Sequence, residues 1–196
     1  MPLDIQPLLN YISNHVTLSP QEEAILKEHV SVRSYLKGQY VLQQGDVCKT
    51  SSFILKGCVK MFYVDETGHE HIIMLGVEDW WTSDIGSFIN QTPADFNIQC
   101  LEDTHFAQFH FDSIDLIYER VPKLERFFRK VTERGLAAAL NRIIRNFSMT
   151  AKDRYLVFKE NYPSIEQRIP QYLVASYLGI TKEFLSKIKS QLAVEE

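Results

Sequence analysis

Residues 36–73 read LKGQYVLQQGDVCKTSSFILKGCVKMFYVDETGHEHII, and this stretch decides the fold of the N-terminal half of the chain. Runs rich in β-branched and aromatic residues, such as QYVLQ, SSFIL and CVKMFYV, alternate with turns at QGD, KG and DETG. The same pattern of β-rich runs separated by turns extends from Val32 to Phe111. It includes the further runs VRSYL, HIIMLGV, FNIQCL and HFAQFHF. About seven antiparallel strands at this spacing are typical of a β-sandwich, a roll or a small barrel.

Helical patterns flank this β-rich region on both sides. Before it, Ser19 precedes a proline and two acidic residues, which predicts a short helix within residues 17–30. After it, SIDLIYERV predicts another short helix that ends near Pro122. Residues 122–147 then predict one long amphipathic helix with basic side chains on its polar faces.

The long helix is a candidate dimer seam. Its apolar stripe runs along the whole helix, and the alanines at 137–139 would allow a second helix to approach closely. A core helix of a single chain is the alternative, and the pattern leaves it open. The residues expected at the dimer interface are Leu124, Phe128, Val131, Leu136 and Leu140.

Residues 168–192 read RIPQYLVASYLGITKEFLSKIKSQL and predict a helix-turn-helix. Pro170 can begin the first helix, Gly179 supplies the turn, and Thr181 can cap the second helix. Apolar positions of the second helix recur three and four residues apart, so they must be buried and its polar face must point outward. Such a face can read the major groove of DNA, although it could also be only a solvated surface. The expected DNA contacts are Thr181, Lys182, Glu183, Ser186, Lys187 and Lys189.

Composition and charge narrow the class of protein. The first residues lack a secretory signal pattern, and no run of about 18 apolar residues could span a bilayer, so we expect a cytoplasmic protein without membrane partners. The three cysteines include no CxxC pair, which predicts neither a disulfide framework nor a zinc site. The net charge is -4, yet residues 150–196 carry 7 basic and 6 acidic side chains, which permits DNA binding there.

This order of parts resembles the Crp/Fnr family of transcription regulators. Residues 36–73, with glycines at Gly38, Gly45 and Gly57, are similar to the family's cyclic-nucleotide-binding-type β-roll. Residues 175–192, ASYLGITKEFLSKIKSQL, are similar to its helix-turn-helix. The resemblance implies an α+β fold with an N-terminal antiparallel β-roll of the double-stranded β-helix or jelly-roll type, a long dimerisation helix and a C-terminal helix-turn-helix domain. The expected boundaries are 1–118, 119–148 and 149–196.

The resemblance also implies a function. A Crp/Fnr-type chain would be a sequence-specific DNA-binding transcriptional regulator that acts as a homodimer on an inverted-repeat site in double-stranded DNA. Lys182, Glu183 and Lys187 fall where the family's base-reading residues fall. RNA polymerase is a further candidate partner, and we expect no enzymatic activity.

One segment departs from the family pattern. In nucleotide-responsive members a Gly-Glu-Leu tripeptide and an Arg-Ser/Thr pair bind the phosphate. The matching positions here form the candidate effector pocket, namely Ser83, Asp84, Ile85, Ala94 and Asp95. Residues 78–95 hold four carboxylates and no cation, so a phosphate would meet repulsion without a bidentate partner. We therefore predict no cofactor and no regulatory binding of cyclic AMP.

Other effector arrangements stay open at this point. Lys60 on a neighbouring strand could supply the missing cation. An uncharged or cationic effector could instead occupy an apolar pocket near Trp80, Trp81, Ile85 and Phe88, or the regulator could work without an effector.

Two other functions compete with DNA-binding regulation. A cupin-like metal enzyme could use His69 and His71 as ligands, but the glutamate that the cupin pattern needs soon afterwards is missing. A sensor or scaffold without DNA reading is the other alternative. It is favoured by the small number of lysines on the second helix and by the short stretch 161–170, which leaves little room for the family's wing hairpin.

Overall fold

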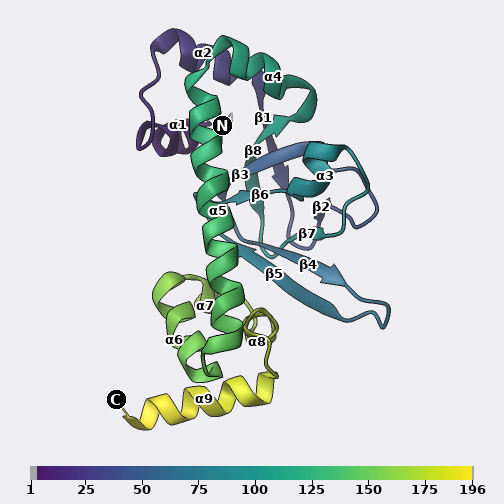
Figure 1. The fold of residues 1–196 in the computed structure, drawn as a ribbon, viewed down its shortest axis with the longest axis vertical. Helices are drawn as coiled ribbons and strands as arrows, with labels where there is room; N and C mark the ends of the chain where they lie inside the picture. The colour runs from purple at the N-terminus through teal and green to yellow at the C-terminus, as the bar shows by residue number, and fades with distance from the viewer. Residues whose placement is uncertain (1–3, 196) are drawn as a thin grey trace.

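The computed structural model describes residues 4–195 and contains two four-stranded antiparallel sheets, several helices that cover them, and a group of C-terminal helices (Figure 1). One sheet has the strand order β1 (Val30–Tyr35), β8 (Thr104–His110), β3 (Thr50–Lys56) and β6 (Trp81–Thr82). The other has the order β2 (Tyr40–Leu42), β7 (Asn97–Cys100), β4 (Val59–Val64) and β5 (Glu70–Gly76). The predicted α+β class is confirmed. Among the strands within residues 4–195, β6, a strand of two residues, is the one that was not among the expected runs.

The two sheets face each other around an apolar core of their own, which includes Leu42, Ile54, Ile98 and Phe106. The turn between β3 and β4 requires glycine at position 57. Gly57 has a φ of +117°, and a Cβ there would lie 2.7 Å from Cα of Thr104. An L side chain rarely adopts this φ, so the glycine keeps the hairpin tight against β8.

Helices cover the outer face of the β1-containing sheet. They are α1 (Gln6–Ser13), α2 (Pro20–His29), α4 (Phe111–Arg120) and the first part of α5 (Lys123–Ser148), while α3 (Ile85–Asn90) lies between β6 and β7 in the chain. Ser19 caps α2 in a capping box with Glu22, in agreement with the predicted helix start. Phe53 and Phe109 of the sheet pack with Leu124 and Phe127 of α5 in one buried cluster.

Helix α5 runs along the molecule from the β-roll to the C-terminal helices (Figure 1). These helices are α6 (Ala151–Asn161), α7 (Ile165–Arg168), α8 (Gln171–Leu178) and α9 (Lys182–Glu195). They share a core with the β-roll: Phe62 and Ile72 of the hairpin β4–β5 pack in the same cluster as Phe158, Leu173 and Val174. Within residues 4–195, none of the helices is long and apolar enough to cross a membrane.

Candidate nucleic-acid interface

Helices α8 and α9 form the helix-turn-helix that the sequence predicts. Gly179 ends α8 in the left-handed region at a φ of +67°, and the N–H of Ile180 donates to the carbonyl of Ala175 at 3.0 Å. This glycine cap closes the last turn of α8 and directs the chain into α9. The side chain of Thr181 accepts a hydrogen bond from the N–H of Phe184 at 3.2 Å, so it caps α9 as predicted.

The packing of α9 determines which of its faces is available. Leu185 and Ile188 are 0% and 2% exposed in the core shared with α8, where the small side chain of Ala175 permits close approach. Figure 1 shows α9 at the end of the molecule opposite to α2 and α4, with its outer side uncovered. The exposed residues on this side are Lys182, Glu183, Phe184, Ser186, Lys187 and Ser190.

Lys189 does not belong to this outward face, so the expectation that it contacts DNA is wrong in this conformation. Its Nζ pairs with Oε1 of Glu166 on α7 at 2.6 Å, because position 189 faces the domain's own helices. Burial raises the pKa of Glu166, but hydrogen bonds from Lys189 and Tyr155 outweigh it and leave that pKa below its usual value. The lysine is therefore held by its own chain.

Phe184 is a residue of this face that the sequence interpretation missed. Its side chain is 47% exposed in the first turn of α9, between Glu183 and the buried Leu185. A phenyl ring at such a position can contact the methyl group of thymine. Its place among polar residues at the start of the helix was the available signal.

Arginine 142 of α5 joins the helix-turn-helix to the β-roll. Its guanidinium donates to the carbonyl oxygens of Ile72, Ile73 and Tyr177, the last at 3.0 Å, and lies 4.1 Å from the centre of the Tyr177 ring. Carbonyl groups of β5 and α8 thus accept hydrogen bonds from one half-buried guanidinium group.

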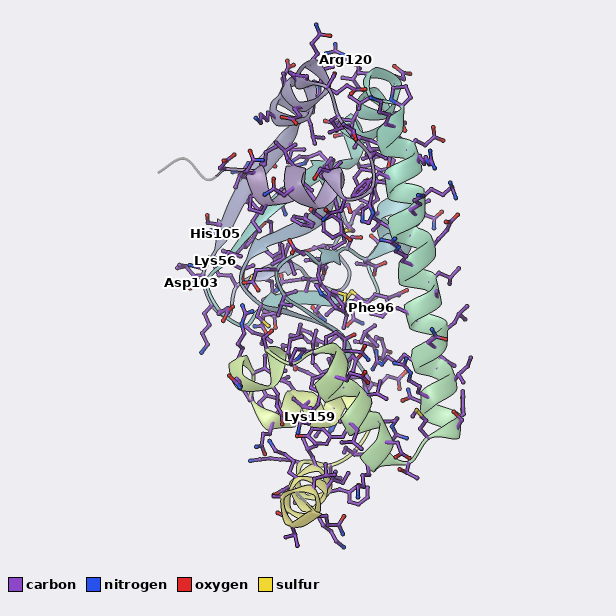
Figure 2. The ribbon with its side chains drawn as sticks, turned by 90° about the vertical axis from the view of Figure 1, so that its left-hand side faces the viewer. Lys56, Phe96, Asp103, His105, Arg120 and Lys159 are labelled. Carbon is purple, nitrogen blue, oxygen red and sulfur yellow. The ribbon has the colours of Figure 1, made fainter. Side chains whose placement is uncertain are left out.

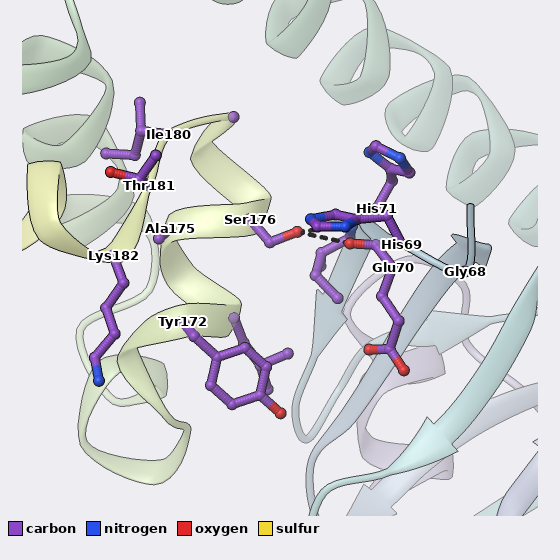
Figure 3. Close-up of a pocket in the computed structure, with 13 residues that line it drawn as sticks. Gly68, His69, Glu70, His71, Tyr172, Ala175, Ser176, Ile180, Thr181 and Lys182 are labelled. Carbon is purple, nitrogen blue, oxygen red and sulfur yellow. Dashed lines mark hydrogen bonds between the residues drawn. The ribbon is translucent and has the colours of Figure 1, made fainter. Parts of the chain in front are cut away.

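A cavity of about 720 Å³ lies between the β4–β5 hairpin and the helix-turn-helix (Figure 3). Ser176 of α8 faces the hairpin, and its Oγ donates to the carbonyl of Glu70 at 3.2 Å. His71 pairs with Asp65 at 2.7 Å instead of converging with His69 on a common point. Groups of three or more side chains suited to holding a metal are absent from the described residues.

A second contact between the domains is ionic. Arg168 of α7 donates to Glu78 at 2.7 and 3.0 Å and also bonds Glu102. The N–H of Gly57 donates to the same Glu78 carboxylate at 2.8 Å. Burial raises the pKa of Glu78, but these hydrogen bonds outweigh it and lower the pKa to about 2.

The candidate effector pocket is organised around Asp84. This carboxylate is 4% exposed and accepts backbone N–H groups from Ser87 at 3.0 Å, Asp95 at 2.9 Å and Phe96 at 3.3 Å. Ala94 is buried and pairs with the backbone of Asp46. The backbone amides that converge here therefore bind the protein's own Asp84 carboxylate.

The other parts of the expected effector region are divided between two clusters. Trp80 packs against Tyr162 and against the core that contains Phe88, whereas Trp81 packs among Phe53, Phe109 and the aromatic residues of α5. Ile85 is 51% exposed. The apolar pocket expected near Trp80, Trp81, Ile85 and Phe88 is therefore wrong, because neighbouring tryptophans of an extended segment point to opposite sides.

Lys60 also has a different role from the one considered above. Its Nζ pairs with Glu70 and lies 4.0 Å from the centre of the Phe62 ring. It does not reach the Asp84 region as a replacement for the missing arginine.

Residues of the candidate dimer seam fall into two groups. Leu124 is fully buried in its own chain, and Phe128 and Val131 pack partly against the same core. The expectation that Leu124 lies at a dimer interface is thus wrong in this conformation, since the β-roll already covers it. Leu136 and Leu140 are 61% and 52% exposed, and they continue into an exposed stripe that includes Ile143, Ile144 and Phe147.

Comparisons with known proteins agree with this geometry. Residues 32–120 match the cyclic nucleotide-binding domain family. The chain is 22% identical over 167 residues to the transcriptional activator protein Anr of Pseudomonas aeruginosa. This alignment covers 80% of this chain and 68% of Anr. Its fold is similar to that of FixK2 from Bradyrhizobium japonicum, with a TM-score of 0.74 and 15% identity over 85% of each chain. It is also similar to that of the c-di-GMP responsive regulator CLP from Xanthomonas campestris, with a TM-score of 0.69 and 13% identity over 90% of this chain and 93% of CLP.

Proposed function

Because this chain belongs with the Crp/Fnr-type transcription regulators, we propose that it reads an inverted-repeat site in double-stranded DNA as a homodimer, without cyclic AMP. Its relatives are transcription regulators rather than enzymes, and the proposed role likewise needs no catalytic group. Such a regulator would act in the cytoplasm, with RNA polymerase as a further partner.

The observation that carries this proposal is the outward face of α9. Lys182, Glu183 and Lys187 are exposed on a helix whose start is capped and whose opposite face is buried. Lysines can donate to guanine edges and a carboxylate can accept from cytosine, so a rigid helix presenting them at its N-terminal turns suits the major groove. The packing of Leu185 and Ile188 against α8 holds this face in one orientation.

The exposed stripe on the second half of α5 supports the homodimer. Leu136, Leu140 and Phe147 would leave an extended apolar surface in water on an isolated chain. A second copy of the same helix, related by a two-fold axis, covers it with the same residues from both sides. This arrangement would place the two α9 helices about 34 Å apart, one turn of DNA, and predicts a site with two-fold symmetry.

Independence from cyclic AMP is supported by Asp84. A cyclic phosphodiester would have to displace a buried carboxylate from three backbone amides, and it would find no arginine at Ala94. Calorimetric titration with cyclic AMP is expected to give no saturable binding below about 10 μM, which corresponds to roughly -7 kcal/mol. A tight complex with one nucleotide per subunit would contradict this part of the proposal.

The DNA-reading role is tested with matched lysine variants. Lys187→Ala should weaken binding to the best genomic site by about 1–3 kcal/mol and relax the preference at one base pair, because it removes a donor to a base edge. Lys159→Ala removes the same charge from α6 within the same group of helices (Figure 2) and should leave base preference unchanged. Fluorescence anisotropy on specific and random duplexes at two salt concentrations measures both. If Lys182→Ala, Glu183→Gln and Lys187→Ala each lose equal affinity for the specific and the random duplex, α9 does not read the base sequence.

A further inference from the structure

A second cavity, of about 470 Å³, lies between the two sheets of the β-roll and is separate from the Asp84 region. Strands β1, β3, β6 and β8 line it from one sheet, and β2 and β7 line it from the other. None of Ser83, Asp84, Ile85, Ala94 or Asp95 is among its lining residues. Its volume lies within the range of about 300–1,000 Å³ that is typical of small-molecule sites.

Polar side chains occupy the floor of this cavity, where a β-roll core would ordinarily be apolar. Ser52, Thr82 and Gln108 stand opposite one another on neighbouring strands and are 1%, 2% and 3% exposed. The amide of Gln108 donates to Ser52 Oγ at 3.0 Å and to Thr50 Oγ1 at 3.4 Å. The hydroxyl of Thr82 is buried and has no hydrogen-bond partner among the described residues. A buried hydroxyl without a partner destabilises the fold unless something else uses it.

Charges surround the mouth of the same cavity. Arg33 and Lys49 are exposed, line the cavity, and form no ion pair within residues 4–195. Asp46 adds one carboxylate, so two cations and one anion leave a net positive charge. Leu42 and Ile98 supply an apolar wall.

From these features we propose that the β-roll cavity binds a small organic acid that carries several hydroxyl groups, such as a sugar acid. The carboxylate pairs with Arg33 and Lys49, since guanidinium and ammonium groups bind carboxylates through charge-assisted hydrogen bonds. The hydroxyl groups reach Thr82 and Ser52 on the floor and Asp46 at the mouth. The carbon chain lies against the apolar wall. This site goes beyond the proposed function and does not depend on DNA binding.

The test uses the full-length protein and two probes, D-gluconate and D-galacturonate, in calorimetry and thermal denaturation. Succinate supplies the charge without hydroxyl groups, and sorbitol supplies the hydroxyl groups without the charge. We expect saturable binding of at least one sugar acid at one per subunit, with a rise in Tm of about 5 °C near saturation. Succinate and sorbitol should bind at least tenfold more weakly. Failure of both sugar acids to bind overturns the proposal.

Variants locate the binding. Thr82→Val keeps the shape of the side chain and removes the unpartnered hydroxyl. It should therefore raise the Tm of the free protein by about 2–4 °C and weaken binding of the sugar acid at least tenfold. Thr104→Val is the matched control, because Thr104 is equally buried but donates to the carbonyl of Glu102 at 2.8 Å. It should lower the Tm and leave binding unchanged.

The charged residues give an independent check. Arg33→Gln and Lys49→Gln should each weaken binding of the sugar acid at least fivefold. Arg120→Gln should not, because Arg120 lies at the end of α4 and does not line the cavity (Figure 2). Binding that survives all three cavity substitutions would place the ligand elsewhere and overturn the proposal. DNA affinity is measured on the same samples, so loss of sugar-acid binding with intact DNA binding separates this inference from the proposed function.

Discussion

The two halves of α5 carry the same kind of apolar stripe but use it differently. In the first half, Leu124 and Phe127 are completely buried against the β-roll of the same chain. In the second half, Leu136, Leu140 and Phe147 are 61%, 52% and 87% exposed. One continuous helix therefore builds a core at one end and leaves an unpartnered surface at the other. Its first half contributes to folding, and its second half is the part left for a partner.

The largest difference between the halves should appear on truncation. Phe127→Ala is expected to lower the free energy of unfolding by about 3–5 kcal/mol, because it opens a cavity in a buried cluster where the rings of Tyr11, Trp81 and Phe128 surround Phe127. Phe147→Ala should change it by less than about 0.5 kcal/mol. Urea denaturation of both variants in the Leu140→Glu background keeps association out of the measurement. A comparable loss of unfolding free energy for Phe147→Ala would show that the two halves of α5 do not differ in their contribution to folding.

Charge insertion should affect the second half through association. Leu140→Glu would bury an unpaired carboxylate at the proposed two-fold contact, so sedimentation at micromolar concentration should give monomers. Affinity for the inverted repeat should fall at least about 100-fold, or roughly 2.7 kcal/mol, since the two half-sites are no longer bound together. Asn146→Glu adds the same charge to an exposed position outside the stripe and should leave the dimer intact. A wild-type protein that is already monomeric would refute the proposed seam.

The sequence predicted the helices and strands better than it predicted which of them pack against one another. Alternation and turn residues were sufficient for most strands, and the cap and glycine signals located α8, the turn and α9. Periodicity could not tell which apolar residues of α5 face their own β-roll, so Leu124 was misplaced. Lys189 was misplaced for the same reason, because its pairing with Glu166 depends on a separate helix. The absence of an arginine at Ala94 was visible in the sequence, but the capture of three amides by Asp84 was not.

Arg142 differs from the exposed stripe on the second half of α5, because its side chain points toward the β-roll and α8. Arg142→Met should leave the carbonyl groups of Ile72, Ile73 and Tyr177 without their donor and lower the free energy of unfolding by about 1–3 kcal/mol. Arg129→Met removes a surface pair with Glu133 and should cost no more than about 0.5 kcal/mol. Faster amide exchange at β5 and α8 in Arg142→Met alone would locate the loosening at this junction.

The smallest expected effect concerns the ionic contact that holds α7 against the β-roll. Glu78 has a pKa of about 2 in the folded chain against an ordinary value of 4.5, so its contribution to stability is complete above about pH 4.5 and is lost as the pH falls toward 2. Because the Glu78 side chain is 39% exposed, solvent screening should limit this contribution to about 1 kcal/mol or less.

Glu78→Gln should therefore be less stable than the wild type at pH 7, and the difference should shrink between pH 4.5 and 2.5 in urea denaturation. Glu119→Gln, which removes a charge from the exposed end of α4, should follow the wild type at every pH. If the difference in free energy of unfolding between Glu78→Gln and the wild type is unchanged across this pH range, the ion pair between Arg168 and the ionised Glu78 carboxylate does not stabilise the fold. In that case the shared core around Phe62 and Leu173 would hold the two domains together on its own.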